Sequence, residues 1–189
     1  MLAGKRLLLI IAGGIAAYKV LELIRRLRER GATVRVILTD AGAEFVTPLS
    51  VATLSHEKVY TDLFSLTDES EMGHLRLAQE AELVVVAPAT ANILAKMAQG
   101  IADDLASTAL LATDKPILVA PAMNVRMWQH PAVQRNVAFL REHGLLLVGP
   151  EAGWLACGDV GPGRMSEPEK LHSAIREQLT RTPPRGARA

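Results

Sequence analysis

The sequence predicts an α/β fold in which a doubly wound, parallel sheet lies between two layers of helices. Short apolar runs alternate along the chain with longer segments that have the periodicity of helices. Two of these runs, LLLIIA at 7–12 and LVVVA at 83–87, are continuously apolar, as expected of strands that are buried on both faces. The composition, 49% hydrophobic with only 4% aromatic residues, is typical of an aliphatic core of this class.

The elements can be placed one by one from these patterns. Gly31 is expected to end the first helix, and Pro88 is expected to stop the third strand. Residues 41–64 have a mixed pattern that indicates a helix followed by irregular chain. Strands are expected at 7–12, 33–39, 83–87, 116–120 and 145–148, and helices at 15–30, 73–80, 91–98, 102–112 and 131–143. A last helix is expected to begin at Ser166, its N-cap, and to run to about residue 180.

Length and charge limit the possible functions. A chain of 189 residues can bury one sizeable core, so residues 1–180 are expected to form one domain, with 181–189 as a disordered tail or linker. The net charge of +1 gives no general attraction to nucleic acid or to anionic membranes. No apolar run is long enough for a membrane span, and no signal peptide is visible. A single cysteine suits a reducing compartment, so we expect a cytoplasmic protein.

The turn after the first strand, IAGGIAAYK at 11–19, joins a strand to a helix through two glycines. Backbone N–H groups at such a helix start can bind a phosphate. The turn lacks the GxGxxG spacing of a dinucleotide site and the GK[ST] of a P-loop, and paired glycines also serve tight packing. Asp40, after the second strand, keeps a dinucleotide-binding interpretation open.

Two later turns carry small polar or apolar groups. PATAN at 88–92 places Thr90 and Asn92 after a strand, where they can bind a ligand; alternatively, this is a plain turn with Asn92 as a helix cap. In PAMNVRMWQHP at 121–131, expected to be a loop, the amide of Asn124 can donate two hydrogen bonds to a carboxylate. The large apolar residues around that amide equally suit a flap over the core.

The stretch WLACGDVGPGRM at 154–165 holds the only cysteine, Cys157. Its glycine content argues against a helix or a strand, so we expect a mobile loop. A thiol with a pKa of about 8.5 is mostly protonated at neutral pH and can act as an acid. Arg164 is its only close basic neighbour, which gives poor support to a nucleophilic triad. His74 heads a short helix, where a structural role is the commoner one, and no spacing indicates a metal site.

Five motifs in this order resemble the flavin-dependent cysteine decarboxylase family, in particular its branch in coenzyme A biosynthesis. They are GGIAAYK, GHLRLA, APATANILAKMAQGIADDL, PAMNVRMW and ACGDVGPGRM, and the likeness covers residues 5–180. The resemblance implies a flavodoxin-like (Rossmann-like, three-layer) fold and FMN as cofactor. It also implies a homo-oligomer, a trimer or a dodecamer of trimers, with the site at subunit contacts. In bacteria the domain is often fused to a phosphopantothenate–cysteine ligase.

The resemblance further implies FMN-dependent decarboxylation of 4′-phosphopantothenoylcysteine to 4′-phosphopantetheine, through a thioaldehyde and an ene-thiolate. His74 would assist proton removal, Asn124 would bind the substrate carboxylate, and Cys157 would donate a proton from a loop that its glycines let fold down as a flap. Met123, Ala156 and Gly158 would also contact the substrate. The resemblance places the following residues around FMN: Gly14, Ile15, Ala16, Ala17, Thr39, Phe45, Pro88, Ala89, Thr90, Ala91, Asn92, Ser107 and Ala122.

Other activities remain open at this stage. A peptidyl-cysteine decarboxylase can stop at the ene-thiol and lack the reducing cysteine, whereas Cys157 is present here. A flavin prenyltransferase carries a different first glycine loop. A non-catalytic FMN-binding regulatory subunit shares the fold but carries an acidic tail, and a nicotinamide-dependent reductase rests on Asp40 alone.

Overall fold

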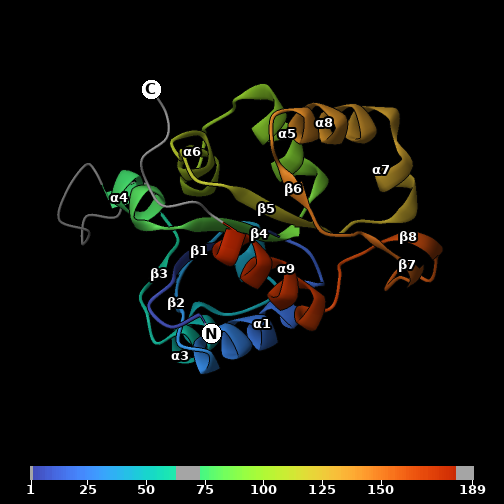
Figure 1. Ribbon diagram of the computed structural model, residues 1–189. Coiled ribbons are helices and arrows are strands. Elements are labelled where there is room, and N and C mark those ends of the chain that lie inside the picture. Colours follow the sequence, from blue (N-terminus) through green and yellow to red (C-terminus); the bar gives the residue numbers. More distant parts are fainter. Residues whose placement is uncertain (1, 63–72, 182–189) are drawn as a thin grey trace.

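The computed structural model describes residues 2–62 and 73–181, and its main feature is a six-stranded parallel sheet (Figure 1). The strand order is β3-β2-β1-β4-β5-β6, so the chain reverses its direction of winding between β1 and β4. Ligands of such sheets bind beyond the carboxyl ends of the strands at this reversal. The strands are β1 (Arg6–Ile11), β2 (Thr33–Leu38), β3 (Val59–Tyr60), β4 (Leu83–Ala89), β5 (Ile117–Pro121) and β6 (Leu146–Leu147).

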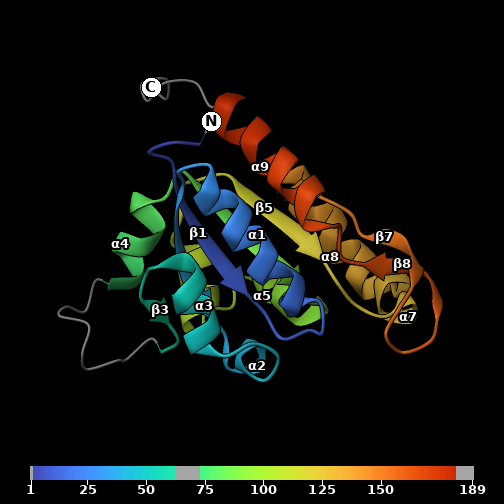
Figure 2. The same ribbon diagram turned by 90° about the horizontal axis from the view of Figure 1, so that it is seen from below.

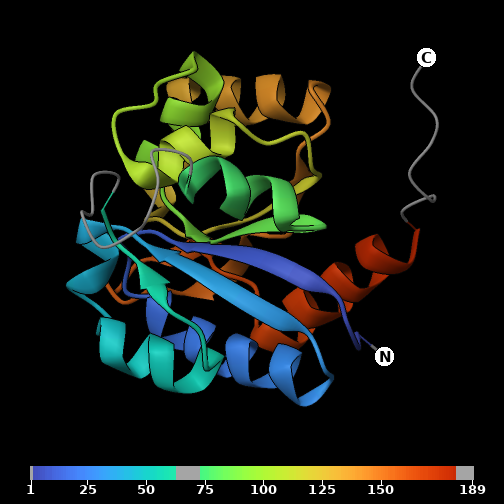
Figure 3. The same cartoon turned by 90° about the vertical axis from the view of Figure 1, so that its left-hand side faces the viewer.

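Helices cover both faces of the sheet, as the sequence predicts (Figures 1 and 3). Alternate residues of β1 face opposite layers: Leu7 and Leu9 pack with α1 and α9, whereas Leu8 and Ile10 pack with α5, α6 and α8. Figure 2 shows α1 and α9 side by side across one face. The helices are α1 (Ala17–Glu29), α2 (Asp40–Ala43), α3 (Pro48–Ser55), α4 (Gly73–Glu80), α5 (Ala91–Gln99), α6 (Leu105–Leu111), α7 (Val125–Gln129), α8 (Pro131–Glu142) and α9 (Pro168–Arg181).

Four local predictions were wrong. The strand β4 runs through Pro88 to Ala89, with a shift in its register to β5 after Val86. Residues 125–129 form the short helix α7 instead of a loop, because the side chain of Asn124 caps its first turn. A helix and irregular chain were expected at 41–64, but the described part of this segment, up to residue 62, holds α2, α3 and β3. The helix α9 begins at Pro168, two residues after the expected cap.

The prediction of a loop at 154–165 was also wrong, because β7 (Glu151–Trp154) and β8 (Val160–Arg164) form an antiparallel hairpin. Gly163 takes a φ of 150°, and a Cβ there would lie 2.2 Å from the carbonyl oxygen of Met123. The N–H of Met123 donates to the carbonyl of Gly163 over 3.0 Å. Gly163 therefore permits the hairpin to dock closely against Met123. The sequence alone did not reveal this role of the glycine.

The described ends of the elements agree with simple capping rules. Gly100 ends α5 in the left-handed conformation, with a φ of 68°. The helix α6 begins at Leu105, later than the predicted 102, because Asp104 caps it. The tail expected at 181–189 lies outside the described residues, apart from Arg181 at the end of α9. No helix in the described part of the chain is long and apolar enough to cross a membrane.

Candidate functional site

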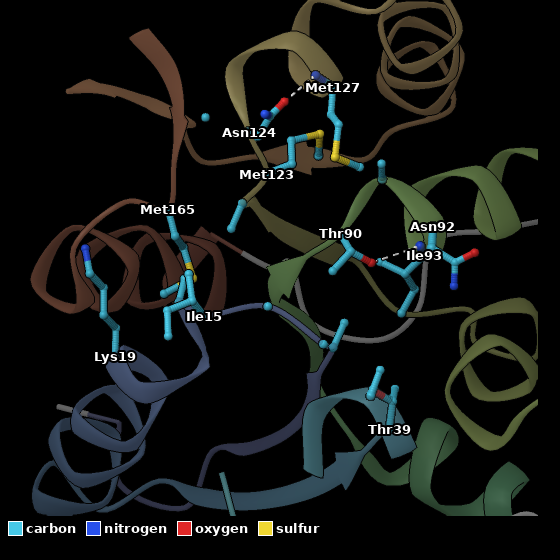
Figure 4. Close-up of a pocket in the computed structure, with 18 of the residues that line it drawn as sticks. Ile15, Lys19, Thr39, Thr90, Asn92, Ile93, Met123, Asn124, Met127 and Met165 are labelled. Atoms are coloured by element: carbon cyan, nitrogen blue, oxygen red, sulfur yellow. Dashed lines mark hydrogen bonds between the residues drawn. The ribbon is translucent and has the colours of Figure 1, made fainter. Parts of the chain in front are cut away.

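A cavity of about 760 Å³ lies at the carboxyl ends of the strands, between the sheet and the hairpin (Figure 4). This size falls within the range of small-molecule and cofactor sites. The residues around it come from the turn before α1, the ends of β2 and β4, the segment before α7, and the hairpin. Twelve predicted site residues line it: Gly14, Ile15, Ala16, Thr39, Thr90, Ala91, Asn92, Ala122, Met123, Asn124, Ala156 and Cys157.

The two glycines before α1 have different surroundings. A Cβ on Gly13 would lie 2.4 Å from the Cβ of Ala41, so packing against α2 requires this glycine. A Cβ on Gly14 would meet nothing closer than Pro88 Cγ at 3.7 Å, so packing alone does not require that one. No side chain caps the N-terminus of α1. The positive end of a 13-residue helix thus begins beside the cavity, an arrangement that favours an anion.

Two threonines at the cavity hold helix starts in place. Thr39 Oγ1 accepts from the N–H of Gly42 over 3.0 Å and lies 3.2 Å from the carbonyl oxygen of Ile11, to which its hydroxyl donates. Thr90 Oγ1 accepts from the N–H of Ile93 over 3.3 Å, so the cap of α5 is this residue (Figure 4). The alternative in which Asn92 serves as the cap is therefore wrong. The exposed side chain of Asn92 lines the cavity.

Asn124 caps α7, and the cap determines which way its amide points. Its Oδ1 accepts from the N–H of Met127 over 2.9 Å, as Figure 4 shows. The amide oxygen is thus engaged by backbone, which leaves both N–H bonds of Nδ2 for a ligand. Met123, which is 9% exposed, lies against the hairpin, and Met127 is 48% exposed beside the cavity. The wall combines neutral donors with apolar surface.

Cys157 lies at the turn of the hairpin and is exposed at the cavity. Its thiol donates to Oδ2 of Asp159 over 3.5 Å. Ala156 lines the cavity beside it, whereas Gly158, with a φ of 89°, is not among the lining residues. The hairpin therefore holds the thiol over the same space into which Asn124 projects.

The structure does not bring every predicted residue to this cavity. Ala17 and Ala89 are fully buried, and Pro88 is buried in β4 behind the lining of the cavity. Phe45 is 46% exposed and outside the lining. Ser107 forms a capping box with Asp104 at the start of α6. His74 is the second residue of α4, and its side chain lies outside the described residues.

Asp40, which the sequence singled out, lines the cavity, but the sequence patterns did not reveal Lys96 and Asp104, which line it too. Lys96 lies one helical turn after Asn92 on α5. Its Nζ lies 2.6 Å from carboxylate oxygens of Asp103 and Asp104, and these bonds raise the pKa of the ammonium. Burial opposes ionisation of Asp104, but the bonds from Lys96 and Ser107 outweigh it and keep the pKa of that carboxyl low. Lys19, also at the cavity, donates to Glu167 over 2.7 Å.

The described residues show no cluster of three or more His, Cys, Asp or Glu side chains that could hold a metal ion. The site combines a doubly wound sheet, an uncapped helix start and a cavity with a mostly apolar lining. These features define an α/β protein that binds a phosphate-bearing cofactor. More particularly, the chain belongs to the Flavoprotein family, whose sequence model matches residues 1–180.

Comparison with known proteins refines this membership. The coenzyme A biosynthesis bifunctional protein CoaBC of Vibrio vulnificus is 50% identical over 183 residues, which is 97% of this chain and 45% of that protein. The Escherichia coli CoaBC is 51% identical over 167 residues, 88% of this chain and 41% of that protein. The chain thus spans less than half the length of these curated relatives.

Solved structures are similar over nearly the whole chain. A cysteine-to-serine mutant of PPC decarboxylase in complex with pantothenoylaminoethenethiol has a TM-score of 0.84 and 35% identity, and the match covers 93% of this chain and 98% of that one. The FMN-binding protein AtHal3 has a TM-score of 0.83 and 35% identity, with 95% and 98% covered. These matches confirm the flavodoxin-like fold that the resemblance implies.

Proposed function

We propose that this chain binds FMN and decarboxylates 4′-phosphopantothenoylcysteine to 4′-phosphopantetheine in coenzyme A biosynthesis. One observation carries the proposal: Asn124 before α7 and Cys157 on the hairpin, far apart in sequence, line the same cavity as the glycine turn. The likeness to CoaBC proteins and to PPC decarboxylase supports it. The role of the thiol requires a reduced cysteine, which suits the cytoplasm.

The cavity fits FMN by its size and by the groups that it offers. Its apolar wall of Ile15, Ile93 and Met127 suits a flat heterocycle, and the uncapped start of α1 beside Gly14 suits a phosphate. When bound, FMN supplies reversible two-electron oxidation and reduction of the substrate's thiol-bearing carbon. The protein contributes binding, orientation and exclusion of water.

Asn124 would hold the substrate carboxylate through the two N–H bonds that its capping role leaves over. A neutral amide binds a carboxylate less strongly than a cation does. Less ground-state stabilisation is therefore lost when CO₂ departs. The cap also restricts the rotation of this side chain, so the donors are oriented before the substrate binds.

Cys157 would return a proton to the product. Its Sγ lies 3.5 Å from Oδ2 of Asp159, to which the thiol can donate a hydrogen bond. The turn that carries it is exposed, so the thiol can reach a bound substrate from the open side of the cavity. His74 would assist proton removal, a role that rests on the family resemblance.

A homo-oligomer would complete the site. Ile15 and Tyr18 line the cavity and are 58% and 59% exposed, which leaves apolar surface at its mouth for a neighbouring subunit to cover. A trimer, alone or within a dodecamer, is the assembly that we propose. The CoaBC relatives are bifunctional, and we propose a phosphopantothenate–cysteine ligase domain as a fused partner of this domain.

Two substitutions test the assignment with one assay of CO₂ and thiol product. Cys157→Ser should still release CO₂ from phosphopantothenoylcysteine but form little phosphopantetheine. Asn124→Asp keeps a good helix cap but replaces the donors with a negative charge, so it should lose CO₂ release by at least about 100-fold while remaining folded. A colourless wild-type protein that cannot be loaded with FMN, or equal loss of both products in Cys157→Ser, would refute the proposal.

A further inference from the structure

Arg164, the last residue of β8, lines the cavity, and the proposed reaction does not yet use it. Its backbone is paired with Glu151 at a shift in the register of the hairpin, next to Gly163. Bulges of this kind redirect side chains. The guanidinium lies over bare backbone: a Cβ on Gly153, in the neighbouring strand, would be 3.1 Å from Nη1 and 3.2 Å from Cζ. The hairpin thus holds this side chain in place by packing.

The charge of Arg164 is not matched within the described part of the chain. Three cations line the cavity, and two of them are bonded to carboxylates: Lys19 to Glu167, and Lys96 to the acidic pair at the start of α6. For Arg164, the described residues offer no carboxylate within salt-bridge distance. Its Nε is buried and has no hydrogen-bond partner there. An unmatched buried donor of this kind is rare and needs an explanation.

Glu151, which is paired with Arg164 across the hairpin, is engaged elsewhere. Its Oε1 accepts from Nζ of Lys170 over 3.0 Å. This bond is the main reason why the pKa of Glu151 is lowered, and the charge of Arg164 adds only a small contribution. A structural ion pair with Glu151 therefore does not account for the guanidinium.

We propose that Arg164 binds a phosphomonoester in this cavity through its guanidinium. The planar fork of donors matches a phosphate bidentately, and a phosphate in the cavity would balance the charge that the described residues leave without a carboxylate partner. The inference deepens the proposed function, because FMN and the proposed substrate both carry a phosphomonoester. The substrate carboxylate is assigned to Asn124, so the anion for Arg164 is one of these two phosphates.

Two equilibrium titrations distinguish the two sources. In the first, FMN and riboflavin are titrated into the apoprotein and followed by flavin fluorescence. In the second, phosphopantetheine and pantetheine are titrated into flavin-loaded protein by calorimetry. Arg164→Gln should weaken binding of the phosphorylated member of one pair by at least about tenfold and leave the other member unchanged, because charge-assisted hydrogen bonds are lost. The affected pair identifies the phosphate.

Two further variants exclude a general structural effect. Arg164→Lys keeps the charge without the fork and should show an intermediate loss. Arg126→Gln removes a positive charge from an exposed residue of the nearby helix α7, outside the cavity lining, and should bind all four compounds as the wild type does. A merely structural role of Arg164 would weaken both members of a pair equally, and that result overturns the proposal.

The remaining outcomes separate this proposal from the proposed function. Equal affinities of wild type and Arg164→Gln for every compound overturn the role of Arg164 alone. A second outcome is that Arg164→Gln loses affinity only for a phosphorylated compound, while the wild-type protein releases no CO₂ from phosphopantothenoylcysteine. This outcome refutes the proposed activity but supports the phosphate site. A wild-type protein that binds neither pair overturns both.

Discussion

The two walls of the cavity are built in different ways. The first wall, formed by Gly14, Thr39, Thr90 and their neighbours, follows the carboxyl ends of buried strands, and the sheet fixes its position. The second, the hairpin of β7 and β8, lies outside that sheet and docks through few contacts, among them the bond between Met123 and Gly163. Residues proposed to bind the cofactor lie on the first wall, whereas Cys157 and Arg164 lie on the second.

This difference suggests a division of labour. A wall that belongs to the core can open only when the domain unfolds, whereas a peripheral hairpin can open by itself. A site that must retain a cofactor and exchange a substrate benefits from one wall of each kind. Changes in the first wall should therefore alter global stability, and changes in the second should alter local opening.

The largest expected effect is on the first wall, from Gly13→Ala. The added methyl group would lie 2.4 Å from the Cβ of Ala41, so α2 must shift, and we expect the free energy of unfolding to fall by about 1–3 kcal/mol. Gly14→Ala is the matched control, because its methyl group has ordinary contact distances and should change stability by less than about 0.5 kcal/mol. Urea denaturation measures both. Equal destabilisation by the two variants would contradict this assignment of the glycines.

The next effect concerns the second wall, through Gly163→Ala. A methyl group 2.2 Å from the carbonyl oxygen of Met123, at a φ of 150°, should undock the hairpin with a local cost of about 1–3 kcal/mol. The midpoint of global unfolding should change less than in Gly13→Ala. Hydrogen exchange of the Met123 amide, which donates to Gly163, reports the undocking. Val160→Ala, which shortens a side chain of the same strand that is 64% exposed, is the control. Unchanged protection in Gly163→Ala would show that the docking does not need this glycine.

A smaller effect on the free energy of unfolding is expected at low pH from Asp104, which belongs to the acidic pair at the start of α6 in the first wall. The pKa of Asp104 lies below its ordinary value in the folded state, so its contribution is present above the ordinary carboxyl pKa and is lost as the pH falls through the folded value. Asp104→Asn keeps a cap for α6 but removes the charge that pairs with Lys96. Because the side chain is 43% exposed, solvent screening should limit the loss at neutral pH to less than about 1 kcal/mol.

The measurement is the unfolding free energy from about pH 3 to pH 7, a range that spans ordinary carboxyl pKa values. The difference between wild type and Asp104→Asn should shrink towards the acid end. Glu44→Gln, an exposed change outside the acidic pair, provides the comparison. A difference that stays constant over this range would show that the charge of Asp104 contributes nothing to folding.

The two walls also differ in how far the sequence predicts them. The first follows from buried apolar runs, because a parallel sheet brings the ends of its strands to one edge whatever the details of the turns. The hairpin does not follow, because its glycines argue against a strand, and the need for Gly163 is explained only by the approach of Met123, which is remote in sequence. The family resemblance placed Asn124 and Cys157 at one site, and both line the cavity. It did not reveal that Asn124 is also a cap.

Ser107 shows why individual lining residues are harder to predict than walls. The resemblance assigned it to FMN, but its hydroxyl and backbone close the capping box with Asp104. The ion pairs at the cavity are equally hard to predict from the sequence, because the pairing of Lys96 with Asp103 and Asp104 depends on how α5 and α6 pack. Sequence patterns locate elements, whereas the partner of each polar group is set by tertiary contacts.

The smallest effect is expected where the two walls are linked, at the ion pair of Lys19 with Glu167. The pair joins α1 to the segment between β8 and α9 over 2.7 Å. Lys19 is 12% exposed but Glu167 is 52% exposed, so Glu167→Gln should cost at most about 1 kcal/mol, less at high salt. Glu177→Gln, which breaks an exposed pair with Arg181 within α9, is the control.

A double-mutant cycle with Lys19→Met isolates the coupling between the walls from other effects of each change. We expect a coupling energy of a few tenths of a kcal/mol that disappears in high salt. We also expect faster exchange of the Met123 amide in Glu167→Gln but not in Glu177→Gln, because only the first pair ties the hairpin side to α1. If neither quantity changes, the hairpin is held by its contact with Met123 alone, and the two walls move independently.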